Sequence, residues 1–196
     1  MKHYFLSTME SLFSALLAAA WLFGATVMPV RADPGAVNEY AIKAAFVYNF
    51  IQFVEWPPSA FPDPGTLLMI GVLGTDPFGP LLDQTVKGES VKGRDLVVRR
   101  FRDVDDVKSC HVLFISKSEK EQIPLILKRL EGLPILTISE LDGFADRGGV
   151  VNFYTEKNRV RFEINHESAR RKGLKITSQL LCLGRIVGRE SSKEVR

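Results

Sequence analysis

The chain has 196 residues, of which 45% are hydrophobic and 25% are charged, and its formal net charge at pH 7 is +3. A chain of this length and composition is sufficient for one domain with a packed apolar core. The near balance of 26 basic and 23 acidic residues argues against a nucleic-acid-binding protein, which normally shows a much larger basic excess.

The first 32 residues predict a cleavable secretory signal peptide. Lys2 and His3 form a weakly basic start, and the apolar run 12–27 is rich in alanine and leucine. Val30-Arg31-Ala32 offers small residues at the two positions that a signal peptidase reads. The alternative is an uncleaved anchor, but the run is shorter than the roughly 20 residues of a membrane span. We therefore expect an exported protein that begins at or near Asp33.

Residues 40–56 predict the first helix. Asn49, Gln52 and Glu55 recur every three residues and form one narrow polar stripe, while most other positions are apolar. Pro57 disfavours helical geometry at the residue before it and is expected to end the element. A helix this apolar needs cover on most of its circumference, and the pattern leaves open whether its own sheet or a partner protein covers it.

The middle of the chain alternates predicted strands with predicted helices. Four strands are predicted, at residues 67–73, 94–101, 112–116 and 134–138, and the first of them is a continuous apolar run. Asp76 and Pro77 predict the start of one helix, and Ser118 with Glu121 the start of another. This alternation is typical of an α/β domain with a mainly parallel sheet.

The last third predicts a β-hairpin followed by two helices. Residues 150–154 and 159–164 form the two strands, and the second alternates apolar with charged residues, which predicts one buried face and one charged face. Asn165 is expected to cap a short helix, and residues 177–187 a final one. Residues 189–196 form a polar tail. Because neither a repeat nor a linker is visible, we expect residues 33–188 to be one domain.

The sequence shows none of the common catalytic or metal-binding motifs. His111 and His166 lack a partner at metal-ligand spacing, and the serine-hydrolase motif is absent. Gly74 and Gly79 have the spacing of a phosphate loop, but Pro80 stands where that loop needs lysine. We therefore expect no enzyme activity, no cofactor and no metal.

Two cysteines are present, Cys110 and Cys182. Both lie in apolar surroundings that suit buried free thiols. An exported protein also permits a disulfide, and the sequence leaves a bond between them open.

Five segments in order resemble the YfiR-like family of exported bacterial proteins: KAAFVYNFIQFVEWP, VLGTDPFG, SCHVLFIS, GGVVNFYTEKNRVRFEIN and GLKITSQLL. The resemblance implies a single-domain three-layer α/β/α sandwich with a mainly parallel sheet, located in the periplasm and tending to form a homodimer. It also implies a regulator that binds the periplasmic domain of an inner-membrane diguanylate cyclase and holds it inactive, which would control cyclic-di-GMP and biofilm formation. Some members have further cysteines in disulfides, whereas Cys110 has no obvious partner of that type.

Three classes of function follow. They are a regulator that binds a membrane partner, a periplasmic small-ligand sensor or carrier, and an enzyme, for which no convergent set of residues is visible. Ligands of open α/β sheets sit at the carboxyl ends of parallel strands, where Gly74, Thr75 and Ser116 lie. A sensor role is therefore compatible with the regulator.

The charged face of the hairpin is the candidate binding surface. Its candidate residues are Arg159, Arg161 and Glu163, with Asn165 and Arg170 just beyond. Arginine is frequent at interfaces because its planar group pairs with carboxylates through two hydrogen bonds. The alternative is that Arg161 and Glu163 neutralise each other in solvent, which contributes less than about 1 kcal/mol.

Overall fold

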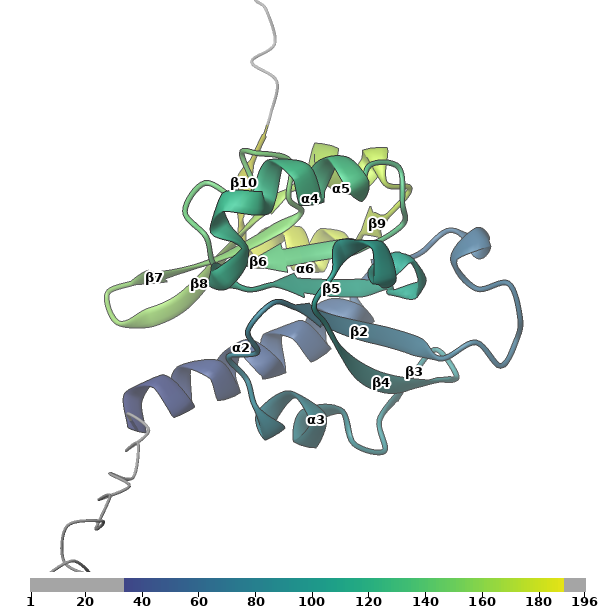
Figure 1. Cartoon of the computed structure of the whole chain (residues 1–196), viewed down its shortest axis with the longest axis horizontal. Helices are drawn as coiled ribbons and strands as arrows, with labels where there is room; N and C mark the ends of the chain where they lie inside the picture. Colours follow the sequence, from purple (N-terminus) through teal and green to yellow (C-terminus); the bar gives the residue numbers. More distant parts are fainter. Residues whose placement is uncertain (1–33, 189–196) are drawn as a thin grey trace, which may run out of the picture. The chain divides into compact units, whose positions relative to one another are not determined.

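The computed structural model describes residues 34–188, so the expected signal peptide and polar tail lie outside the described residues. Figure 1 shows a central sheet with helices on both faces. Its strands are β2 (Leu68–Leu73), β3 (Ser90–Val91), β4 (Arg94–Phe101), β5 (Val112–Ile115), β6 (Leu136–Ser139), β7 (Val151–Glu156), β8 (Arg159–Asn165) and β10 (Arg185–Val187). Their order across the sheet is β10-β8-β7-β6-β5-β2-β4-β3.

The sheet is mainly parallel. The neighbours from β4 through β2, β5 and β6 to β7 all pair parallel, and β10 pairs parallel with β8. The two antiparallel pairs are the hairpin β7–β8 and the short edge pair β3–β4. The expected α/β class, the mainly parallel sheet and the C-terminal hairpin are confirmed.

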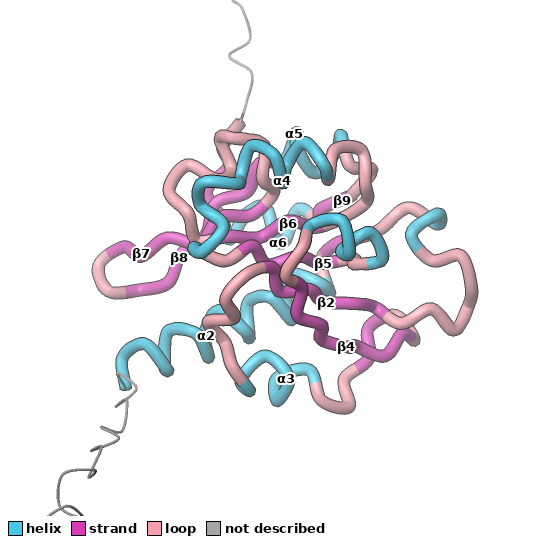
Figure 2. The backbone as a smooth tube through the Cα atoms, viewed as in Figure 1, coloured by secondary structure: helices cyan, strands magenta, loops and turns pink. Residues whose placement is uncertain are grey.

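The α-helices are α2 (Pro34–Gln52), α3 (Pro80–Val86), α4 (Ile123–Arg129), α5 (His166–Arg171) and α6 (Ser178–Leu183). The 3-10 segments are η1 (Pro58–Ala60), η2 (Val104–Ser109) and η3 (Lys117–Gln122). In Figure 2, α2 and α3 lie on one side of the strands, and α4 and α5 lie together on the other. No helix within residues 34–188 is long and apolar enough to cross a bilayer.

Two apolar clusters pack against the two faces of the sheet. In β5, Val112 and Phe114 belong to one cluster, and Leu113 and Ile115 to the other. Because alternate residues of a strand point to opposite faces, the two clusters lie on opposite sides of the sheet. All four side chains are fully buried, which explains why this strand reads as a continuous apolar run.

The first helix ends earlier than the sequence predicts. It ends at Gln52 rather than at the residue before Pro57, because the next residues form the short strand β1 (Val54–Glu55). This strand pairs antiparallel with β9 (Lys175–Ile176), and the Thr177 amide donates to the Phe53 carbonyl at 3.0 Å. A tertiary ladder therefore overrides the local helical pattern, and Asn49, Gln52 and Glu55 remain exposed as expected.

Other predicted boundaries also shift. The helix expected at Asp76 begins only at Pro80, because the Asp76 carboxylate accepts from the Phe78 amide at 2.8 Å and forms a turn instead. The helix expected over residues 177–187 ends at Leu183, and the residues after Gly184 join the sheet as β10.

Candidate functional site

The helix α2 is held across the hairpin by aromatic side chains. Phe50 packs on Phe162 of β8 with ring centroids 4.8 Å apart, and on Phe153 of β7 at 5.8 Å. Phe46 lies one turn away and contacts Phe162 at 5.5 Å. These contacts bury one side of α2 against the hairpin. The protein's own sheet therefore buries much of the apolar surface of this helix.

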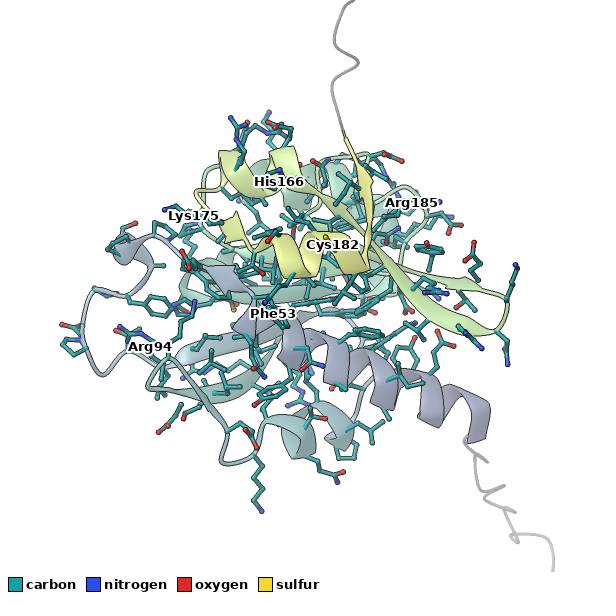
Figure 3. All side chains as sticks on the ribbon, turned by 180° about the vertical axis from the view of Figure 1, so that it is seen from behind. Phe53, Arg94, His166, Lys175, Cys182 and Arg185 are labelled. Atoms are coloured by element: carbon teal, nitrogen blue, oxygen red, sulfur yellow. The ribbon has the colours of Figure 1, made fainter. Side chains whose placement is uncertain are left out.

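A groove of about 400 Å³ opens beside this aromatic contact, between α2, β8 and α6. Figure 3 shows α6, which carries Cys182, next to Phe53, the residue that follows α2. The residues that line the groove are Phe46, Asn49, Phe50, Phe53, Val160, Arg161, Phe162, Leu180 and Leu183. We call this surface the α2–α6 groove.

The chemistry of the α2–α6 groove is apolar with a single cation. Leu183 is 68% exposed, although it is a large apolar side chain. Arg161 is the one charged side chain among the described residues that line the groove. Gly184, which follows α6, lies so close to the Phe162 ring that a Cβ on it would be 2.5 Å from that ring. The groove therefore presents a mainly apolar surface together with the guanidinium of Arg161 and the amide of Asn49.

The structure separates the five residues of the predicted binding surface. Arg159 and Arg161 are exposed, as expected, and Arg161 lines the groove. Glu163 is only 4% exposed, so its expected place on a solvated face is wrong. Its carboxylate accepts from Asn152 at 3.1 Å and pairs with Arg185. The physical reason is β10, which aligns Arg185 with Glu163 in the ladder.

The other two candidates have different surroundings. Asn165 is 4% exposed, so the expectation that it extends an exposed patch is wrong. It caps α5 as the sequence predicts, by accepting from the Ser168 amide at 2.8 Å, and it also donates to the Ala145 carbonyl. Arg170 is exposed and pairs with Glu167 at 3.3 Å. Within residues 34–188, the expected pair between Arg161 and Glu163 is not formed.

A buried charged cluster, absent from the sequence-based expectations, lies at the carboxyl end of the sheet. Glu140 follows β6 directly, and its carboxylate accepts from Lys43 and, at 2.7 Å, from the Tyr40 hydroxyl, both on α2. Lys43 is 2% exposed and Glu140 is 8% exposed. Burial alone would raise the pKa of Glu140, but the hydrogen bonds from Lys43 and Tyr40 outweigh it and hold the pKa below its ordinary value.

The carboxyl ends of β2, β5 and β6 are closed by the protein's own groups. The Thr75 amide, after β2, donates to the Ser118 hydroxyl at 3.0 Å, and the Ser139 hydroxyl at the end of β6 donates to the Ile115 carbonyl at 2.7 Å. Together with the Glu140 cluster, these bonds give several polar groups protein partners at the place where the sequence suggested a ligand. The α2–α6 groove is therefore the better candidate site.

His111 has a structural role. It accepts from the Met69 amide at 3.1 Å, its other ring nitrogen lies 2.9 Å from the Ala60 carbonyl, and its ring stacks on Phe61 at 4.4 Å. Burial lowers its pKa. The neighbouring Cys110 packs in the apolar cluster that contains Leu113 and Ile115. Among the described residues, no group of three or more histidine, cysteine or acidic side chains is placed to hold a metal ion.

The model of the YfiR/HmsC-like family matches residues 40–185. The chain belongs to this family. YfiR/HmsC-like proteins are periplasmic and are regulatory rather than catalytic. No curated protein matches the chain.

Two solved structures resemble the fold of this chain. The chain is similar to a conserved domain protein from Vibrio cholerae O1 biovar El Tor strain N16961, with a TM-score of 0.50 and 12% identity. It is also similar to a protein described as the ABC domain in complex with L-Trp from Streptococcus pneumonia, with a TM-score of 0.51 and 10% identity. Each match covers 74% of this chain and 60% of the other. At these identities the likeness shows the α/β fold alone.

Proposed function

We propose that this YfiR/HmsC-like protein binds the periplasmic domain of an inner-membrane diguanylate cyclase and holds the enzyme inactive. The observation that carries the proposal is the α2–α6 groove, in which exposed Leu183 and the guanidinium of Arg161 stand at an apolar surface. Family membership supports a regulator of cyclic-di-GMP signalling. The same proposal includes a homodimer, which light scattering of the purified protein tests.

The groove suits a protein segment that brings an apolar side chain and a carboxylate. A pocket-filling apolar anchor is the usual source of binding energy at an interface, and Arg161 would pair with the carboxylate. Binding restrains the cyclase only if the groove fits the inactive conformation better than the active one, because a partner shifts a conformational equilibrium only by its difference in affinity. A released cyclase then makes more cyclic-di-GMP.

Deletion followed by complementation tests the proposal. We expect deletion to raise cyclic-di-GMP and surface attachment, and the wild-type chain to restore both. Leu183→Glu and Arg161→Glu are expected to fail in complementation while melting at the wild-type temperature. Arg159→Glu is the matched control, because Arg159 is exposed on the same strand but does not line the groove.

Two results would count against the proposal. Unchanged cyclic-di-GMP after deletion, in a strain that carries the cyclase, would argue against any restraint. Full complementation by stable Leu183→Glu and Arg161→Glu variants would remove the α2–α6 groove as the contact, even if the restraint itself were real.

A periplasmic small-ligand sensor or carrier is the second candidate function. The volume of the groove, about 400 Å³, lies in the range of small-molecule sites. One protein of similar fold is described in complex with L-Trp. Calorimetric titration with L-Trp tests this role, and binding that Arg161→Glu abolishes would support it. A sensor and a cyclase partner are compatible if the ligand occupies the groove and displaces the partner.

A further inference from the structure

A second cleft, of about 670 Å³, lies between α4 and α5. Figures 1 and 2 show these two helices side by side, on the side of the sheet away from α2 and α3. The charged side chains that line the cleft are Lys128 and Glu131 near the end of α4, Arg147 in the loop before β7, and Arg171 and Lys172 at the end of α5. Four cations therefore face one carboxylate.

Three of the four cations, Arg147, Arg171 and Lys172, donate hydrogen bonds only to uncharged groups among the described residues. Arg147 donates to the carbonyls of Asp142 and Gly143, and Arg171 donates to the Ser168 hydroxyl at 2.8 Å. None of the four takes part in an ion pair within residues 34–188. Each guanidinium has five N–H donors, so both arginines retain donors for a ligand.

Lys172 is the most unusual of the four, because it is 7% exposed. Its ammonium donates to the Leu130 carbonyl at 2.7 Å, which satisfies the end of α4 and leaves two of its three donors without a protein partner in the described structure. Burial lowers its pKa to about 8, an effect that Glu131 opposes and Arg171 reinforces. A buried cation beside other cations is unfavourable for folding unless an anion joins it.

We propose that the cleft between α4 and α5 binds a small phosphate-bearing molecule. A phosphate monoester has close to two negative charges at neutral pH and three acceptor oxygens, which suits the two arginines and Lys172. Pro124 and Leu127 give the cleft an apolar wall for an organic group, and the volume exceeds that needed by inorganic phosphate alone. This site is separate from the α2–α6 groove and does not depend on the cyclase.

Binding is measured on the full exported chain, by calorimetry and thermal melting. The probes are inorganic phosphate and glycerol 3-phosphate, each compared with sodium chloride at equal ionic strength, because salt alone screens charges. We expect both phosphates to bind and to raise the melting temperature. Arg147→Gln and Arg171→Gln should each weaken binding at least tenfold. Arg170→Gln is the control, because Arg170 is the neighbouring arginine and does not line the cleft.

Vesicles of phosphatidylglycerol distinguish a free phosphate from a lipid headgroup. Flotation with these vesicles that depends on Arg147 and Arg171, without binding of the soluble probes, would support the same phosphate site with a membrane lipid as its source. The proposal is overturned if neither the soluble phosphates nor the vesicles bind. It is equally overturned if Arg147→Gln and Arg171→Gln both bind as the wild type does, since the effect would then come from general salt or surface charge.

Discussion

Glu140 shows how a single buried carboxylate ties the first helix to the sheet. Its partners Lys43 and Tyr40 lie on α2, far from it in sequence, and Lys43 also contacts Glu39 on the same helix. The pair is almost completely removed from water. A buried ion pair contributes little net stability by itself, but removing one partner leaves the other charge buried and unpaired, which is strongly destabilising.

We expect Glu140→Gln to lower the free energy of unfolding at pH 7 by about 3 kcal/mol, since Lys43 keeps only the half-exposed Glu39 as a charged partner. The pKa of Glu140 lies below its ordinary value of 4.5. Its contribution is therefore present above that pH and is lost as the pH falls through the lower folded pKa. Urea unfolding from pH 7 to pH 3 should show a smaller acid-induced loss in the variant than in the wild type.

The two cysteines should react very differently. Both are free; Cys110 is buried, while Cys182 is exposed on α6, so the expectation of two buried thiols holds only for Cys110. Burial raises the pKa of Cys110 to about 12, and only the thiolate is nucleophilic. We expect iodoacetamide to modify one thiol per native chain, and mass spectrometry to place it at Cys182. Rapid modification of Cys110 in the folded protein would contradict the structure.

The hairpin β7–β8 illustrates what alternation in a strand can and cannot predict. Alternation correctly placed Phe162 and Ile164 in the core, because side-chain direction along a strand depends only on position. It did not predict that Glu163 is buried, because that burial comes from β10 and Asn152 rather than from neighbours in sequence. Contacts of this kind become visible only when the strand order is known.

Two substitutions in β8 should therefore differ in their effect on stability. We expect Glu163→Ala to lower the free energy of unfolding by about 1–3 kcal/mol, because it leaves the Asn152 amide buried without its acceptor. Arg161→Ala should change it by less than about 0.5 kcal/mol, since Arg161 is exposed. Chemical denaturation of both variants measures the difference. Equal losses of unfolding free energy in the two variants would contradict the burial of Glu163 and the exposure of Arg161.

The central strand β2 contains a close approach that only glycine permits. A Cβ at Gly71 would lie 2.8 Å from the Cys110 sulfur and 2.9 Å from Leu113. We expect Gly71→Ala to lower the free energy of unfolding by about 1–3 kcal/mol, because a packed core accommodates an added methyl only by moving its neighbours. Gly65→Ala, at an exposed position with nothing within 4 Å, is the control and should be nearly neutral.

At the scale of the whole molecule, the architecture was predictable from sequence and the site was not. Apolar runs identified β2, β5 and β6, since buried parallel strands need apolar residues on both faces. The two-residue strands β1 and β9 are too short for any periodicity. The α2–α6 groove joins residues from α2, β8 and α6, and among them only Arg161 was recognisable from sequence as a candidate for binding.

Export remains a prediction for the whole chain. We expect the mature protein to begin at or near Asp33, because the preceding residues have the order of a cleavable signal. N-terminal sequencing of protein released by osmotic shock checks this. An intact Met1 in the membrane fraction would show instead that the leader stays attached.

The packing of α2 on the hairpin also governs how the chain reaches its folded state. A chain is synthesised from its N-terminus, so α2 emerges first, whereas Phe153 and Phe162, which cover its aromatic side, come near the end. Closing so long a loop is entropically unfavourable and slow. Until the hairpin forms, Phe46 and Phe50 lack their native contacts, and the unfolded chain exposes these aromatic side chains to solvent. A chain truncated before β7 should therefore aggregate, even though it keeps β2 to β6. The uncovered aromatic side of α2 is also the surface to which we expect a chaperone to bind.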